Sequence, residues 1–528
     1  MLKQYIVRFL AISLIVSCAS GHRSTSVKLR EYVMAGSFDK AVEYLKASPL
    51  AIDEKSKLLY HTELGLLEHY QGNYQASNDS LTVAKNLIEE LYTTRASGKI
   101  KSVISNDNAD FYYGEKYEAS LVFFYLSLNH YMLSMKEPDA MKKKNFLAQA
   151  RSEVVAWDSF LTEIKNERLG QALFKEDLLA KTFGALVHES QNNFKDDQIA
   201  LQLYKDAQAV FFKNYNLFPT FNSSYEAFRK NFSSFPDMAM DEVEGKYVIA
   251  TQHNNSFKEF LQLKINYLSL RMQRKPSADE STISFLIQDG LIAEKIPQKY
   301  EFPMAWGMHQ SSALSMGSGA KISFELPAIQ GVEKLETSRL QALNKEGVVV
   351  AEGPVSVIAP LSDLAQQAIN EHSTAIAAKT ATRVAAKHIT ALVASSATYE
   401  AGRRNNNSLT MMLALAGHAA ATASINASEK ADVRFWSTLP SSIRMAHITL
   451  PKGIYHFRAV FGPVEAPRKI IELGTHDLNT ENSKFVMKSK DLKFTPAPVM
   501  VTEPVQVAIK PQDLKVQDRS ISGSPAGN

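Results

Sequence analysis

The distribution of prolines constrains the fold of this chain more than any other feature of its sequence. The chain has 528 residues and 19 prolines, and only four of those prolines come before Pro276. Proline lacks a backbone N–H and breaks helix interiors, so long helices are expected where it is rare. We therefore expect an α+β multidomain protein, with helices over residues 25–275 and mostly strands and turns beyond them.

The first residues are typical of a lipoprotein signal peptide. Lys3 and Arg8 accompany the apolar run Phe9–Val16, which is too short to span a bilayer. The run ends in Ile-Val-Ser-Cys at residues 15–18, which resembles a bacterial lipobox, and Cys18 is the only cysteine in the chain. The resemblance implies a signal peptide over residues 1–17 and acyl chains such as palmitate on Cys18. The alternative is an ordinary signal peptide with an incidental cysteine.

This start predicts a location in the cell envelope. Several acyl chains on Cys18 would hold the protein at a membrane, with residues 18–24 as a short linker. Ala19 follows the cysteine, not the Asp that commonly retains lipoproteins at the inner membrane of enteric bacteria. We therefore expect an outer-membrane lipoprotein that faces the periplasm, with surface display as the alternative.

Charge and cysteine content exclude other classes. An exported chain with one cysteine has no internal disulfide and must be stabilised by its core. Loss of residues 1–17 removes Lys3 and Arg8, which lowers the formal charge from +4 to +2. A nearly balanced charge argues against nucleic acid as the main partner.

A weak repeat in the first half predicts pairs of helices. The pattern Gly-x-aromatic-x-x-small occurs at residues 36–41 and 72–77, and a looser copy lies at residues 115–120. Such spacing resembles tetratricopeptide (TPR) repeats, in which the aromatic wedges between two helices and the small residue lets them approach. An irregular helical bundle is the alternative. The positions concerned are Gly36, Phe38, Ala41, Gly65, Gly72, Tyr74, Ser77, Tyr117 and Ser120.

Apolar periodicity predicts further helices in the same half. The spacing is helical over Phe146–Ile164, Lys175–Glu189 and Gln198–Tyr215, and Glu242–Arg271 is predicted as the last helix.

Alternating residues predict an antiparallel, sandwich-like β-domain over residues 276–360 and 432–494. Asp289-Gly290 predicts a hairpin turn between Ile283–Ile287 and Leu291–Ile292, and residues 451–453 predict another before Tyr455. Beyond them, residues 495–528 are rich in Pro, Ser and Gly and predict an extended or disordered tail.

Residues 361–431 interrupt the β-domain and contain 20 alanines. They predict two helices joined by residues 402–408, with Lys379, Arg383 and Lys387 on one face of the first helix. Such a helical hairpin packs on the sheet, contacts a membrane surface or mediates homo-oligomerisation; packing is the simplest of the three.

Three stretches together resemble a known family. They are residues 359–371, residues 431–440 and residues 450–455. With the lipobox and the helical half, the chain is similar to an uncharacterised family of Gram-negative bacterial lipoproteins with a TPR-like N-terminal half and an all-β C-terminal half. Members carry Asp-Thr-Arg-x-Trp where this chain has Asp-Val-Arg-Phe-Trp at residues 432–436. The resemblance supports the fold and the location and transfers no catalytic residue.

No motif predicts catalysis, a metal or a cofactor. His188-Glu189 lacks the second histidine of a zinc motif, because Asn192 stands in its place. Gly317-Ser-Gly319 lacks phosphate-loop spacing, and no Gly-x-Ser-x-Gly elbow exists. Asp432, Arg434 and Trp436 are the remaining candidates, either as a contact for a partner or as a structural anchor in which Arg434 pairs with Asp432.

These observations favour a non-enzymatic envelope scaffold that binds a protein partner through its TPR-like half. The alternative is an envelope-directed hydrolase, acting on peptidoglycan or lipid, with an unrecognised active site.

Overall fold

The structure is a computed structural model. It describes residues 18–96, 111–166, 177–214, 240–241, 246–247, 265, 268–269, 280–303, 321–332, 338–462, 467–479, 483–488 and 505–506. The predicted signal peptide lies outside these residues, as does the predicted tail apart from Val505–Gln506.

The chain forms two compact units. The first contains Met1–Ile296, Pro327–Thr374 and Asp432–Pro498, and the second contains Pro297–Leu326, Ala375–Ala431 and Val499–Asn528. This division differs from the predicted one, because the helices and the main sheet belong to the same unit. The physical reason is a shared apolar core, in which residues of the helices cluster with Leu286, Val357 and Trp436 of the C-terminal half.

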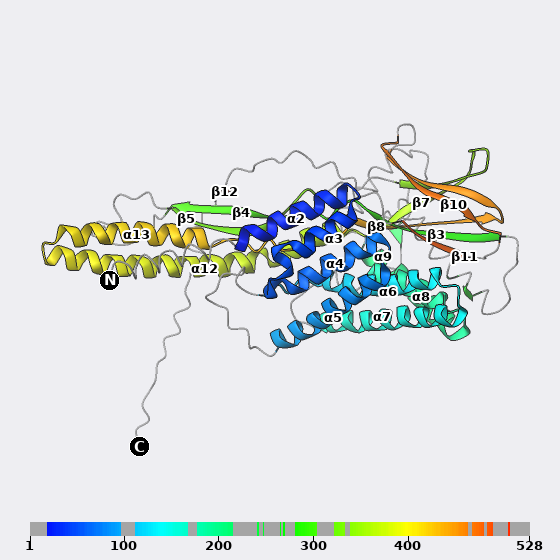
Figure 1. The fold of residues 1–528 in the computed structure, drawn as a ribbon, viewed down its shortest axis with the longest axis horizontal. Coiled ribbons are helices and arrows are strands. Elements are labelled where there is room, and N and C mark those ends of the chain that lie inside the picture. Colours follow the sequence, from blue (N-terminus) through cyan, green and yellow to red (C-terminus); the bar gives the residue numbers. More distant parts are fainter. Residues whose placement is uncertain are drawn as a thin grey trace, which may run out of the picture. The chain divides into compact units, whose positions relative to one another are not determined.

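Helices precede strands in the chain, as the sequence predicts (Figure 1). Consecutive helices of the N-terminal half pack against one another. They are α2 (Cys18–Met34), α3 (Phe38–Ala47), the short 3-10 helices η2 (Pro49–Ala51) and η3 (Glu54–Ser56), α4 (Lys57–Gln71), α5 (Tyr74–Ala96), α6 (Lys116–Lys136), α7 (Ala140–Asn166), α8 (Leu178–Glu189) and α9 (Phe194–Asn214). The residues predicted as a linker, 18–24, belong to α2.

The predicted repeat positions lie where these helices meet or end. Gly65 of α4 faces α5 so closely that a Cβ there would lie 2.5 Å from Cγ of Leu81. Ser77 Oγ donates to the Gly65 carbonyl at 2.6 Å. Gly36 and Gly72 have φ of 67° and 81°, which favours glycine where a helix ends. The aromatic and small positions are buried: Phe38, Ala41, Tyr74, Ser77, Tyr117 and Ser120.

The helix predicted over Glu242–Arg271 is wrong at its start. Strand β2 (Lys246–Tyr247) pairs antiparallel with β1 (Met240–Asp241). Tyr-Val-Ile at residues 247–249 is β-branched and aromatic, and this composition outweighs the weak helical period. Within the rest of the predicted helix, residues 265, 268 and 269 are described as helical.

The main sheet has seven strands in the order β10-β9-β6-β7-β8-β3-β11. Its neighbouring strands are antiparallel except for β11, which runs parallel to β3. The strands are β3 (Glu280–Asp289), β6 (Ser338–Leu343), β7 (Val349–Ala359), β8 (Ser442–Pro451), β9 (Ile454–Phe461), β10 (Lys469–Asp477) and β11 (Ser483–Lys488).

Both predicted hairpins are wrong: the strands on either side of residues 451–453 exist but do not pair with each other, and Leu291–Ile292 lies between two strands and belongs to neither. Strand β8 pairs with β3 and β7, and β9 pairs with β6 and β10, so residues 451–453 carry the chain across the sheet. After Gly290 the chain leaves β3 and enters β4 (Glu294–Pro303) of another sheet. Turn residues specify a local reversal, but the partner of each strand depends on which apolar faces meet.

The seven-stranded sheet curls on itself. Phe285 of β3 and Phe457 of β9 lie with ring centroids 5.2 Å apart. Four strand spacings separate β3 from β9 in the sheet order, which is about 19 Å in a flat sheet. The two strands therefore face each other across a core that also contains Leu340 and Ile471.

The second unit contains a three-stranded sheet, in the order β12-β4-β5, and the predicted pair of helices. Its elements include β5 (Lys321–Gln330), α12 (Leu361–Arg404), α13 (Ser408–Ser428) and β12 (Val505–Gln506), and both β4 and α12 continue into it from the first unit. Val384 of α12 packs with Phe324 and Leu326 of β5. On the predicted basic face, Arg383 and Lys387 pair with the buried carboxylate of Glu429.

Candidate functional site

The candidate residues Asp432, Arg434 and Trp436 lie in one stretch without helix or strand between α13 and β8. We call residues 432–438 the joint segment. Its backbone and side chains contact α2, α4 and α6, so it joins the helices to the sheet within the first unit.

Two buried glutamates of the helices accept the backbone N–H groups of the joint segment. Glu118 of α6 accepts from Trp436 N at 2.8 Å, and Glu63 of α4 accepts from Ser437 N at 2.7 Å. The Ser437 hydroxyl also donates to Glu63 at 2.7 Å, and the Thr438 hydroxyl donates to its second oxygen. Each carboxylate therefore accepts at least one hydrogen bond from a segment that is more than 300 positions away in the sequence.

Carbonyl groups of the same segment accept hydrogen bonds from side chains of the helices. Arg30 of α2 donates to the carbonyls of Ser437 at 2.9 Å and Ile292 at 2.8 Å. The Tyr70 hydroxyl of α4 donates to the Thr438 carbonyl at 3.0 Å. Backbone N–H groups and carbonyl groups of the joint segment thus both have partners on helices.

Arg434 and Asp432 form a two-pronged ion pair inside this contact. Arg434 Nε and Nη2 donate to the two carboxylate oxygens of Asp432 at 2.9 and 2.7 Å. The side chain of Arg434 is 4% exposed, and its guanidinium lies over the Tyr112 ring at 5.6 Å. Trp436 is fully buried beside Tyr125. Arg434 and Trp436 are therefore buried in the first unit, and Asp432 is partly buried, with its side chain 25% exposed.

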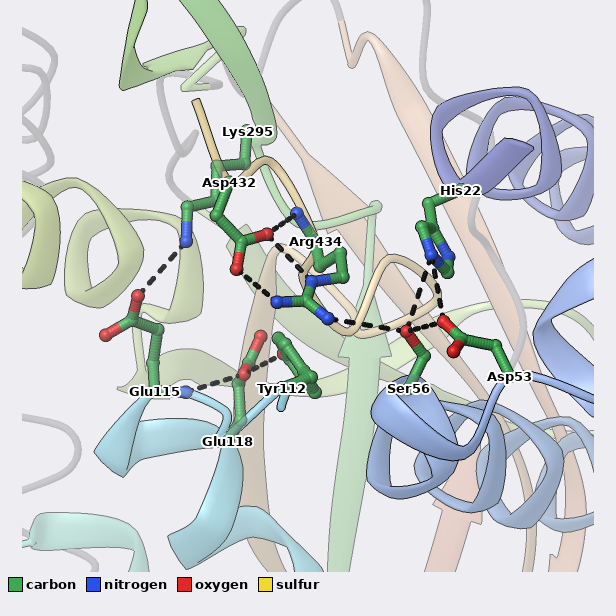
Figure 2. Close-up of polar contacts among 9 residues, drawn as sticks. All are labelled: His22, Asp53, Ser56, Tyr112, Glu115, Glu118, Lys295, Asp432 and Arg434. Atoms are coloured by element: carbon green, nitrogen blue, oxygen red, sulfur yellow. Dashed lines mark hydrogen bonds and ion pairs between the residues drawn. The ribbon is translucent and has the colours of Figure 1, made fainter. Parts of the chain in front are cut away.

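The start of α6 extends the polar cluster (Figure 2). Glu115 and Glu118 form a reciprocal capping box, in which Glu115 N donates to Glu118 at 2.8 Å. The Tyr112 hydroxyl donates to Glu118 as well. On the other side, Lys295 of β4 donates to Glu115 at 3.2 Å.

His22, Asp53 and Ser56 lie at the other edge of the cluster in Figure 2 and superficially suggest a hydrolytic triad. The Ser56 hydroxyl donates directly to Asp53 at 2.7 Å, and His22 Nε2 lies 3.2 Å from the same carboxylate. A triad needs the acid on one ring nitrogen and the serine on the other. Here His22 Nε2 contacts both Ser56 and Asp53. The acid therefore does not orient the ring through one nitrogen while the other nitrogen accepts the serine proton, so the arrangement is not that of a triad.

Neighbouring opposite charges keep Asp432 and Lys295 ionised. Burial acts to raise the pKa of Asp432, but the hydrogen bonds and charge of Arg434 outweigh it and the pKa is lowered. Burial acts to lower the pKa of Lys295, and the charges of Glu115 and Asp432 outweigh it. Both groups are therefore charged at neutral pH and are held as ions, not as acids or bases near neutrality.

The two glutamates behave differently. Burial raises the pKa of Glu63 to about 7, against the opposing effect of hydrogen bonds from Thr438 and Ser437. Burial and the nearby charge of Glu115 raise the pKa of Glu118. Raised carboxyl pKa values occur in active sites, but these carboxyls are enclosed by their own chain.

A second network of buried polar side chains connects the helices to the sheet. His69 of α4 contacts Asn129 of α6 at 2.6 Å and Gln288 of β3 at 3.1 Å, and the Tyr125 hydroxyl donates to Gln288 at 2.8 Å. Burial lowers the pKa of His69 to about 4, so its ring is neutral. This second network therefore links the helices to the sheet through neutral groups.

Within the part of the chain that the structure describes, no group of three His, Cys, Asp or Glu residues could hold a metal ion. His188 pairs with Asp196 at 2.7 Å inside the helical half.

Comparisons with known proteins found no match to this chain among family models, curated proteins or solved structures. The functional argument therefore starts from the geometry of the molecule itself.

Sequence reasoning found the joint segment but missed its partners. Glu63, Glu118 and Arg30 are charged residues on helices, a pattern that ordinarily indicates a solvated face. One signal was present: Glu115 and Glu118 are spaced as a capping box at the start of an apolar helix. The others gave none, because only the fold brings them to residues more than 300 positions away.

Protonation of Glu63 makes stability depend on pH. Its folded pKa of about 7 lies above the ordinary value of 4.5, so its contribution is complete below pH 4.5 and is lost as pH rises toward 7. The loss is about 3 kcal/mol in the free energy of unfolding. We expect Glu63→Gln to remove this slope in urea unfolding measured from pH 4.5 to 7.5, with exposed Glu54→Gln as the control. Parallel curves for wild type and Glu63→Gln would contradict the assignment.

Proposed function

We propose that the chain is a lipid-anchored protein of the cell envelope that acts as a non-enzymatic scaffold for a protein partner. The lipobox at Cys18 and the resemblance to Gram-negative lipoproteins support the anchor and the outer-membrane location. The polar cluster of Figure 2 supports the scaffold role, because its charged side chains and hydroxyl groups have their partners within the chain.

We further propose that the helical half is TPR-like and the sheet sandwich-like. Consecutive packing of helices and the close approach at Gly65 support the first reading. The contact of Phe285 with Phe457, across strands that are not neighbours, supports the second.

One observation supports a particular binding surface for such a scaffold. In repeat proteins of this kind the inner helices commonly hold an extended peptide. Here Glu63 of α4 and Glu118 of α6 already hold the joint segment. A partner would therefore bind the outer helices α5, α7 and α9.

The burial of the helices fits this assignment. Helices α4, α6 and α8 are buried over most of their residues, whereas α5, α7 and α9 each bury one face and expose the other. In Figure 1, α5 and α7 lie on the side of the helical layer away from the sheet. Large apolar side chains exposed on these three helices are Val83, Met141, Val155, Phe194 and Ile199.

The anchor is tested at Cys18. Wild type should incorporate a fatty-acid analogue and fractionate with the outer membrane, because the thiol is the acceptor. Cys18→Ser should take up no label, and Ala19→Ser should label normally. An unlabelled wild type, or a labelled Cys18→Ser variant, would overturn the anchor.

The partner surface is tested by photo-crosslinking in cells. A crosslinking residue at Val155 of α7 or Phe194 of α9, which are 56% and 60% exposed, should give an adduct of reproducible mass. The same residue at Ile470 of β10, 42% exposed, is the control and should give none. Adducts formed only from Ile470, or from none of these positions, would contradict binding through the outer helices.

A further inference from the structure

The helical hairpin of the second unit has an uncharged stem and a charged tip. Helix α13 contains no Lys, Arg, Asp or Glu, and neither do residues 389–399 of α12. The charged residues at the tip are Glu400, Arg403 and Arg404. Among the described residues, α13 is the one helix that is long and apolar enough to cross a membrane, by length and composition only, and it is mostly unburied.

Large apolar side chains on the exposed face of α13 are confined to the end beside those arginines. Leu409, Met412 and Leu413 are 65%, 68% and 62% exposed, and Leu415 is 41% exposed. The exposed positions after them are Ala, Gly or Ser. On α13 the large exposed apolar side chains therefore form a cap near the tip and do not continue as a stripe along that helix. On α12, Val393 and Ile389 are also exposed, at 63% and 43%.

Packing within the hairpin fixes this cap outward. Ala414, His418 and Thr422 are the buried residues of α13 and lie on its opposite face. At the tip, Gly402 approaches Met411 so closely that a Cβ would lie 3.0 Å from its Cγ and its backbone N. At the base, Glu429 holds Arg383 and Lys387. The cap cannot turn inward without breaking these contacts.

The charge of the tip favours an anionic bilayer over a second copy of the chain as the surface that the cap contacts. Arg403 pairs with Glu400 at 2.8 Å, which leaves Arg404 as the net positive charge of the tip. A second copy meeting the cap tip to tip would bring like charges together, and a few side chains expose far less than the ~800 Å² per partner of a stable dimer. An anionic bilayer accepts both features, because apolar side chains enter the interface and arginine contacts lipid phosphates.

We propose that the tip of the α12–α13 hairpin, formed by Arg403, Arg404, Leu409, Met412 and Leu413, docks onto an anionic lipid surface. The helix enters by its first turns and does not span the bilayer. This contact is separate from acylation of Cys18, and it gives the second unit a membrane attachment of its own.

The experiment uses the full chain with Cys18→Ser, which carries no other cysteine. Leu413→Cys then provides a unique thiol for an environment-sensitive fluorophore at the tip. Ala427→Cys, an exposed position at the other end of α13, is the matched control. Vesicles of phosphatidylcholine alone are compared with vesicles that also contain phosphatidylglycerol, and brominated lipids report depth by quenching. Met412→Cys replaces Leu413→Cys if circular dichroism shows lost helix.

We expect a blue shift and quenching at residue 413 with phosphatidylglycerol, and neither at residue 427. Replacing Arg403 and Arg404 with Gln, or Leu409 and Met412 with Ser, should lower the partition of the labelled tip by at least about tenfold. An unchanged probe overturns the proposal, and so does an equal response in both vesicles or at both positions. A shift without vesicles that grows with protein concentration assigns the cap to a second copy and overturns it as well.

Discussion

Two buried carboxylates of the helical half, Glu63 and Glu118, accept two backbone N–H groups of the joint segment, which leads into the sheet. A carboxylate removed from water costs several kcal/mol unless donors surround it. Here the pKa values of both carboxyl groups are raised, so the hydrogen bonds offset only part of the cost of burying the charge. The two buried carboxylates therefore depend on donors of the joint segment, and the segment in turn depends on groups that the helices supply.

This mutual dependence explains why helices and sheet form one unit although they are far apart in sequence. Arg30 and Tyr70 hold the carbonyls of the segment, and Trp436 fills the core beside Tyr125. The proposed partner surface on the outer helices of the first unit and the proposed lipid contact at the hairpin tip of the second unit use residues that take no part in these contacts.

Local features of the fold could be predicted from the sequence, and pairings at a distance could not. Proline distribution and periodicity identified the helices, and alternation identified strands such as β8 and β9, because these patterns depend on neighbouring residues. The β8–β9 hairpin failed because β8 finds its partners in β3 and β7. The motif around Asp432 and Arg434 was visible as a candidate, but Glu63 gave no sign of burial on an otherwise ordinary helix.

Hydrogen exchange with increasing urea tests most directly whether the joint segment makes the helices and the sheet one cooperative unit. In wild type, the slowest amides of α4, α6, β3 and β8 should open with the same free energy. Trp436→Ala, which empties the core of the joint at a cost of about 3–5 kcal/mol, should separate them, with the sheet opening before the helices. Different opening free energies in wild type, or a common value that persists in Trp436→Ala, would contradict the account.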